Sequence, residues 1–68
     1  MDLASHAQLL LETSLRHGAF EEVAAPHDWW DWYAAYMVAR QAGVTADEAS
    51  ATAGRYMADV KHVVVPPA

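Results

Sequence analysis

The feature that most constrains this chain is an aromatic run, "PHDWWDWYAAYM", at residues 26–37. Within these twelve positions lie three tryptophans and two tyrosines. A buried aromatic side chain removes about 150–250 Å² of surface from water, so these five rings would dominate any core that encloses them. The chain must therefore bury this run or present part of it to another molecule.

The chain has 68 residues, the size of one small domain. A domain of this size buries only about 60% of the surface that its unfolded chain exposes, so it is marginally stable alone. There is no cysteine, so neither a disulfide nor a thiolate metal site can supplement the core. A homo-oligomer or a protein partner is therefore an expectation from the start.

Nine acidic residues against four basic ones give a formal net charge of -5. This charge repels phosphate backbones and anionic lipid, so neither nucleic acid nor a membrane surface is expected as a partner. The amino terminus has no basic segment followed by an apolar run, and no stretch approaches about 18 uninterrupted apolar residues. We therefore expect no signal peptide, no membrane span and a cytoplasmic setting.

Fifteen of the hydrophobic residues are alanine and none is isoleucine, which favours helices with closely approaching backbones. A first helix is predicted at about 3–17, with Asp2 as its N-cap and Gly18 as its stop. Leu9 is an exception to its helical pattern, because it points away from the apolar stripe. That stripe consists of Leu3, Ala7, Leu10, Leu11 and Leu15. The opposite side is polar and consists of Ser5, Gln8, Glu12 and Arg16.

Residues 18–27 have no sustained period, and we predict a connection that Phe20 and Val23 pin to the core. Pro26 permits a second helix to begin just after it. This helix is predicted from about Asp28 to Ala42, with its end at Gly43.

The third helix is predicted at about 46–62. "TADE" at 45–48 is a capping box, in which the Thr45 hydroxyl accepts from the Glu48 amide and the Glu48 carboxylate reaches back to the Thr45 amide. The final "VVVPPA" either continues the helical stripe or forms an extended tail at 63–68. The predicted fold is all-α, a small three-helix bundle with a short extended C-terminal tail, in a single domain.

In the second helix the large side chains sweep an arc of roughly 160° on the helical wheel. Asp28, Asp31 and Ala35 occupy the narrow opposite face. Such a wide arc needs cover on two sides, so this helix is predicted to be central, with its aromatics against the alanines of the third helix. The arc comprises Trp29, Trp30, Trp32, Tyr33, Tyr36 and Met37.

Core packing is the favoured interpretation of most of these rings, but three tryptophans are more than a monomer of this size easily hides. Arg40 lies in the same arc. It either snorkels at the helix end, which is the favoured interpretation, or stacks on a tyrosine or receives a partner's carboxylate. The candidate residues for binding a partner or ligand are Trp29, Trp30, Trp32, Tyr33, Tyr36 and Arg40.

The histidines have neither HxxxH nor HExxH spacing, so no metal site and no cofactor is predicted. An up-down-up bundle would bring His17, His27, Asp31 and His62 to one end, which leaves a two-histidine, one-carboxylate site as an alternative. The favoured interpretation is that the histidines and aspartates occupy opposite helix poles. No serine lies in a nucleophile elbow and no glycine-rich loop could hold a phosphate, so an enzyme is not expected.

Residues 17–43, "HGAFEEVAAPHDWWDWYAAYMVARQAG", resemble a helical segment near the carboxyl terminus of actinobacterial bleomycin-resistance or glyoxalase-like proteins, in the vicinal-oxygen-chelate superfamily. Members of that superfamily use paired βαβββ modules around a metal or ligand, and this chain has neither the room nor the strand pattern for one. We therefore transfer no catalytic residue and no metal. The resemblance implies a helical module found beside such domains or alone. The matching positions are Asp31, Trp32, Tyr33, Ala34, Tyr36, Met37, Gln41 and Gly43.

The sequence thus predicts a non-enzymatic interaction module that self-associates, or serves as an accessory subunit, through the exposed part of the aromatic face. The alternative is a protein that binds or sequesters a small planar aromatic compound. Its binding residues would be Trp29, Trp30, Trp32 and Tyr33.

Overall fold

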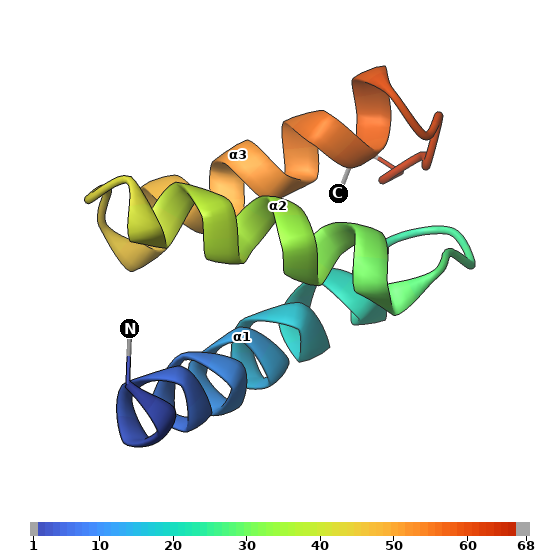
Figure 1. The fold of residues 1–68 in the computed structure, drawn as a ribbon. Helices are drawn as coiled ribbons and strands as arrows, with labels where there is room; N and C mark the ends of the chain where they lie inside the picture. Colours follow the sequence, from blue (N-terminus) through green and yellow to red (C-terminus); the bar gives the residue numbers. More distant parts are fainter. Residues whose placement is uncertain (1, 67–68) are drawn as a thin grey trace.

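The computed structural model describes residues 2–66, which form three α-helices and no strand (Figure 1). They are α1 (Leu3–Val23), α2 (Trp29–Gln41) and α3 (Ala46–Asp59). α2 lies between the other two helices, and α1 and α3 have few contacts with each other. The predicted all-α three-helix bundle is confirmed, with the second helix at its centre.

α1 continues past Gly18, the residue predicted to stop it, and ends at Val23. Gly18 does not adopt the left-handed backbone of a helix-ending glycine. The added turns place Phe20 against the buried core, and this contact offsets the roughly 1 kcal/mol that an interior glycine costs a helix. The predicted connection at 18–27 is correspondingly shortened to residues 24–28.

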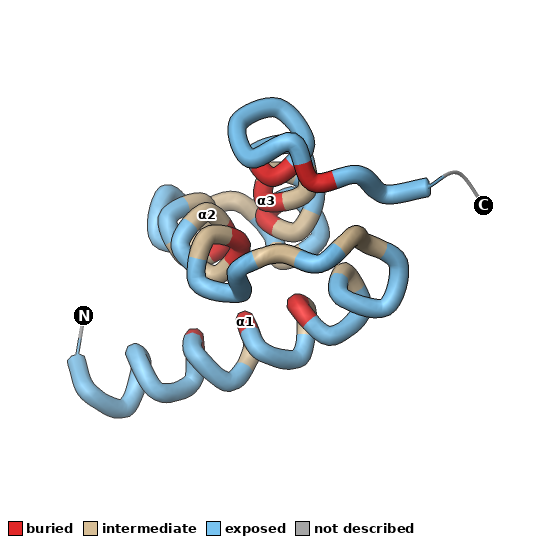
Figure 2. The backbone as a smooth tube through the Cα atoms, turned by 90° about the vertical axis from the view of Figure 1, so that its right-hand side faces the viewer, coloured by how far each residue is buried: buried red, intermediate tan, exposed pale blue. Residues whose placement is uncertain are grey.

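The orientation predicted for the side chains of α1 was also wrong. The residues that α1 buries are Leu9, Thr13 and His17, whereas the leucines of the predicted apolar stripe are exposed. In Figure 2 the buried positions of α1 lie on the side toward the rest of the molecule, and its far side is exposed. The physical reason is that polar contacts help to select the inward side of α1. Glu12 pairs with Arg40 of α2, and Arg16 pairs with Asp47 of α3.

The core is built mainly between α2 and α3. Trp32 and Tyr36 stack with their ring centroids 5.2 Å apart and an interplanar angle of 12°. They share one buried cluster with Ala49 and Ala53, which are both fully buried. Small side chains on α3 let the large rings of α2 approach closely, as predicted.

The helix ends show which of the predicted capping and stop residues are used. α2 begins after Asp28 and ends before Gly43, which has a left-handed φ of 101°. At the start of α3 the Thr45 hydroxyl accepts from the Glu48 amide at 3.2 Å. The reciprocal bond from the Glu48 carboxylate is not formed among residues 2–66, so only half of the capping box is present.

α3 ends at Asp59, earlier than predicted, and the chain reverses at His62, whose φ is 58°. The Val63 amide then donates to the Met57 carbonyl at 2.9 Å, and the Val63 side chain is buried. The Val64 carbonyl accepts from the Ala25 amide at 2.9 Å. The tail is therefore extended and docks on its own chain. Residues 67–68 of the predicted tail lie outside the described range.

Candidate interaction surface

The predicted aromatic arc divides into a buried part and an exposed part. Trp32 and Tyr36 are 1% and 0% exposed, so they belong to the core and cannot contact a partner. The indole N–H of Trp32 is buried and has no hydrogen-bond partner among the described residues. Trp29 and Trp30 are each 54% exposed. The part of the arc that meets solvent is therefore its N-terminal end.

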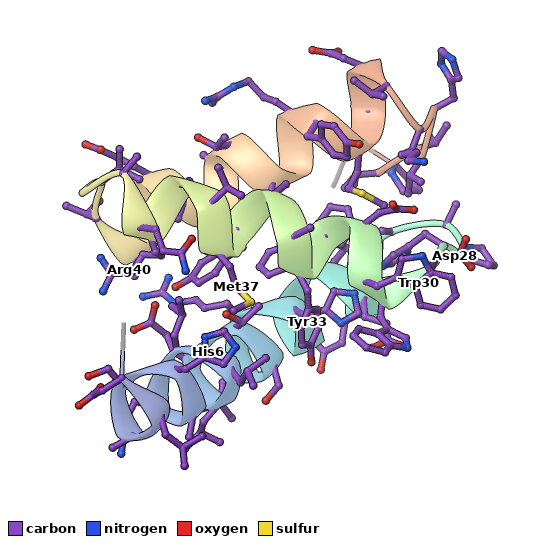
Figure 3. The ribbon with its side chains drawn as sticks, in the orientation of Figure 1. His6, Asp28, Trp30, Tyr33, Met37 and Arg40 are labelled. Atoms are coloured by element: carbon purple, nitrogen blue, oxygen red, sulfur yellow. The ribbon has the colours of Figure 1, made fainter. Side chains whose placement is uncertain are left out.

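The exposed rings form an edge-to-face group at the start of α2. The Trp29 ring centroid lies 5.5 Å from that of Trp30 and 4.8 Å from that of Tyr33, with interplanar angles of 83° and 70°. Figure 3 shows Trp30 at one end of α2 and Arg40 at the other, with Tyr33 on the side toward α1. This geometry is typical of aromatic pairs that stabilise each other, and it leaves ring surface available to a ligand.

Arg40 is held by its own chain. Its Nε donates to Glu12 Oε2 at 2.8 Å, and its Nη1 donates to the Val44 carbonyl at 2.8 Å. The Tyr36 hydroxyl donates to the same Glu12 oxygen at 2.5 Å. The carboxylate that faces Arg40 therefore comes from α1.

This network shifts the pKa values of Glu12 and Tyr36 in opposite directions. The hydrogen bonds from Arg40 and Tyr36 lower the pKa of the Glu12 carboxyl. Burial, together with the hydrogen bond to Glu12, raises the pKa of Tyr36 to about 12. At neutral pH the network is thus a carboxylate between a cation and a neutral hydroxyl.

A second polar contact joins α1 to α3, where Arg16 Nη1 lies 2.7 Å from Asp47 Oδ1 in the first turn of α3. The two polar contacts border an open groove of about 690 Å³ between α1 and the end of α2. Leu11 and Leu15 also line this groove. Since its Arg40 and Glu12 groups are already paired with each other, the groove offers mainly leucine surface to a ligand.

His17 and His27 contact each other, with 2.8 Å between their Nε2 atoms. His27 Nδ1 lies 2.8 Å from the Ala25 carbonyl, so in the neutral pair His27 donates there and accepts from His17 at Nε2. Burial lowers the pKa of the His17 imidazole, while Glu21, 3.6 Å from its Nδ1, opposes this effect. The His17 imidazole therefore favours its neutral form.

The other residues of the two-histidine, one-carboxylate alternative have different surroundings. Asp31 faces Lys61 at 3.6 Å, and His62 lies beside a second groove formed by α3 and the tail. Within residues 2–66 no set of three or more His, Cys, Asp or Glu side chains could hold a metal ion.

A second apolar surface lies on α1 and is here called the outer face. All its residues are exposed, and the exposed fractions of its leucines, in chain order, are 87%, 42%, 57% and 71%. None of its residues is charged. The leucines were visible in the sequence, but the pairing of Glu12 and Arg16, which turns them outward, was not. The outer face comprises Leu3, Ala4, Ala7, Leu10, Leu11, Ser14, Leu15 and Gly18.

Comparison with protein-family models, with curated proteins and with solved structures finds no match for this chain. No helix within the described range is long and apolar enough to cross a membrane. The features of the described chain that bear on function are therefore its two exposed apolar surfaces.

Proposed function

We propose that this chain is a non-enzymatic interaction module that self-associates through the outer face of α1. The observation that carries the proposal is that four leucines lie exposed on one uncharged helix face. The buried core contains none of them. Exposed apolar patches of this kind mark sites of contact with other proteins.

The energetics support a pair of moderate affinity. The exposed fractions of the four leucines correspond to about two and a half fully exposed side chains in each copy. Burying them in a pair would contribute roughly 8–15 kcal/mol, against an association cost on the order of 4–15 kcal/mol. The net free energies allowed by these two ranges include about −8 kcal/mol, which corresponds to a dissociation constant on the order of micromolar.

Self-association would also stabilise a chain that is marginal alone, because a partner that binds only the folded state shifts the folding equilibrium toward it. The cytoplasmic setting expected from the absence of a long apolar run is part of the same proposal.

Sedimentation velocity across the micromolar range tests the proposal. We expect the weight-average sedimentation coefficient to rise with concentration from the monomer value toward the dimer value. Leu11→Ser combined with Leu15→Ser should abolish the rise, because both side chains lie on the outer face. Val38→Ser on α2 is the matched control, since Val38 is as exposed as these leucines but lies off that face. A wild-type chain that stays monomeric at high micromolar concentration would contradict the proposal.

A second candidate, binding of a small planar aromatic compound, is favoured by the edge-to-face group of the exposed Trp29 and Trp30 with the half-buried Tyr33. The resemblance of residues 17–43 to bleomycin-resistance or glyoxalase-like proteins belongs with this candidate. Tryptophan fluorescence titrated with planar compounds separates the two. Saturable quenching that Trp30→Ala removes would support ligand binding, whereas self-association alone predicts no quenching.

A further inference from the structure

We infer that two copies of this chain pair through α1 as antiparallel helices, with the twofold axis beside Leu11. This inference rests on the proposed self-association and assigns its geometry. Homodimers most often have twofold symmetry, in which one patch faces the same patch of the second copy.

Leu11 lies at the centre of the outer face, both along the helix axis and around it. It is midway along the helix between Ala4 and Gly18, and at about 100° per residue it falls within about 30° of the middle of the face. Figure 2 shows α1 along one side of the molecule, with its exposed positions on the side away from the other helices. A second helix would approach this exposed side, and Leu11 and Leu15 border the groove that reaches Arg40 and Gln41 of α2.

The sizes of the side chains select the antiparallel direction. In this register Ala4 lies level with Gly18 of the second copy, and Ala7 lies level with Leu15 of the second copy. Leu15 thus has the small Ala7 at its level, the small residues Ala4 and Gly18 share a level where the two backbones can approach, and the leucines near the axis fill the centre. A parallel pair in register would instead set Leu15 against Leu15 and Gly18 against Gly18, which crowds one level and leaves a void at another.

Gly18 itself is unexplained within one copy. Its φ is not positive, and apart from its chain neighbours and the backbone of its own helix no atom lies within 4 Å of the position that a Cβ would occupy. An interior glycine nonetheless lowers helix stability relative to alanine. Close approach of a second backbone at this level would give the glycine a function.

The uncharged outer face permits a second copy to bind despite the net charge of the chain. The chain carries a net charge of -5, so two copies associate readily only where no like charges enter the contact. The outer face provides such a region, because Glu12 and Arg16 turn inward to Arg40 and Asp47. Antiparallel helices also place opposite ends of the two helix dipoles side by side.

Disulfide trapping tests the register, because the chain has no cysteine of its own. Single variants Leu11→Cys, Leu3→Cys and Gly18→Cys would be oxidised at concentrations where sedimentation shows the dimer. We expect Leu11→Cys to form a disulfide-linked dimer, since only this position meets its own copy across the axis. Leu3→Cys and Gly18→Cys should remain uncrosslinked. Ala58→Cys, on the exposed side of α3, is the control for random collision.

A mixture of Ala4→Cys with Gly18→Cys gives a second reading, because the antiparallel register predicts a mixed disulfide that neither variant forms alone. Crosslinking of Leu3→Cys or Gly18→Cys with itself, whether or not Leu11→Cys also crosslinks, would overturn the antiparallel register and leave self-association standing, because a parallel pair in register brings every outer-face position against its own copy. Absence of any dimer by sedimentation would overturn both the register and the proposed function.

Discussion

The α2–α3 interface and the attachment of α1 use different chemistry. Between α2 and α3, Trp32 and Tyr36 pack on Ala49 and Ala53, and every one of these side chains is buried. α1 instead buries one leucine, Leu9, together with the polar Thr13 and His17. Its C-terminal part packs on the core through Phe20, and its N-terminal part is joined to α2 and α3 by side-chain hydrogen bonds from Glu12 and Arg16. Apolar packing therefore closes the first interface, whereas polar pairs orient α1 and leave most of its leucines outside.

An amphipathic helix therefore need not present its apolar side to the core of its own chain. When specific partners such as Arg40 and Asp47 are available, polar contacts select the inward face. The apolar face then becomes a surface for another molecule.

The largest expected effect comes from emptying the α2–α3 interface. Trp32→Ala should cost about 3–5 kcal/mol, because it leaves a cavity in a packed core. The whole chain is expected to be stable by only about 3–10 kcal/mol, so little folded protein would remain. Urea unfolding followed by circular dichroism measures the loss. Trp30→Ala, at a half-exposed position of the same helix, should cost only about 0.5–1.5 kcal/mol, the contribution of its edge-to-face contact with Trp29. Equal losses for the two variants would contradict the division of the aromatic arc.

Overfilling the same interface is the next largest effect. Ala53→Leu should cost about 1–3 kcal/mol, since Ala53 is fully buried beneath the aromatic rings. Ala51→Leu, on the exposed side of α3, adds the same volume where nothing opposes it. Thermal unfolding of the two variants should show a lower Tm only for Ala53→Leu. A tolerated leucine at position 53 would mean that the α2–α3 contact is looser than described.

Breaking the polar attachment of α1 should have an intermediate effect. Glu12→Gln removes the charge shared by Arg40 and Tyr36, at a cost of about 1–3 kcal/mol. The exposed pair of Arg16 and Asp47 should contribute only about 0–1 kcal/mol, so Arg16→Gln is the matched comparison. Urea unfolding of both variants ranks the two contacts. A larger loss for Arg16→Gln would show that the Glu12 network does not orient α1.

The smallest effect is the pH dependence of the His17–His27 contact. Burial places the pKa of His17 below its ordinary value of 6.5, so the unfolded chain takes up a proton before the folded chain does. The free energy of unfolding should therefore be constant between about pH 7.5 and 9 and decrease as the pH falls through about 6.5. Urea unfolding at a series of pH values measures this slope.

His17→Gln should flatten this dependence, whereas His6→Gln, at an exposed position, should leave it unchanged. Stability that rises as the pH falls through this window would contradict the buried, neutral His17.

The sequence predicted the elements whose signals are local. The N-terminal start of α3 at Thr45 and the end of α2 at Gly43 depend on backbone chemistry within a few residues. The large-on-small packing of α2 against α3 also followed from composition, because only the alanine-rich helix can receive Trp32 and Tyr36.

What the sequence could not supply depends on contacts between distant residues. Gly18 looked like a helix end because the packing of Phe20 on the core cannot be seen locally. The inward face of α1 was misassigned because periodicity locates an apolar stripe but not what covers it. The candidate residues Trp32, Tyr36 and Arg40 turned inward for the same reason, and the outer face was missed as a surface.

The central claim is that the outer face of α1 is a contact between molecules while the α2–α3 interface lies within one molecule. Backbone amide NMR spectra recorded over a dilution series test it most directly, because each residue reports its own environment. We predict that the signals of Leu3, Leu10, Leu11 and Leu15 shift with concentration while those of Ala49 and Ala53 do not. Shifts confined to Trp29 and Trp30, or no shift at any residue, would contradict it.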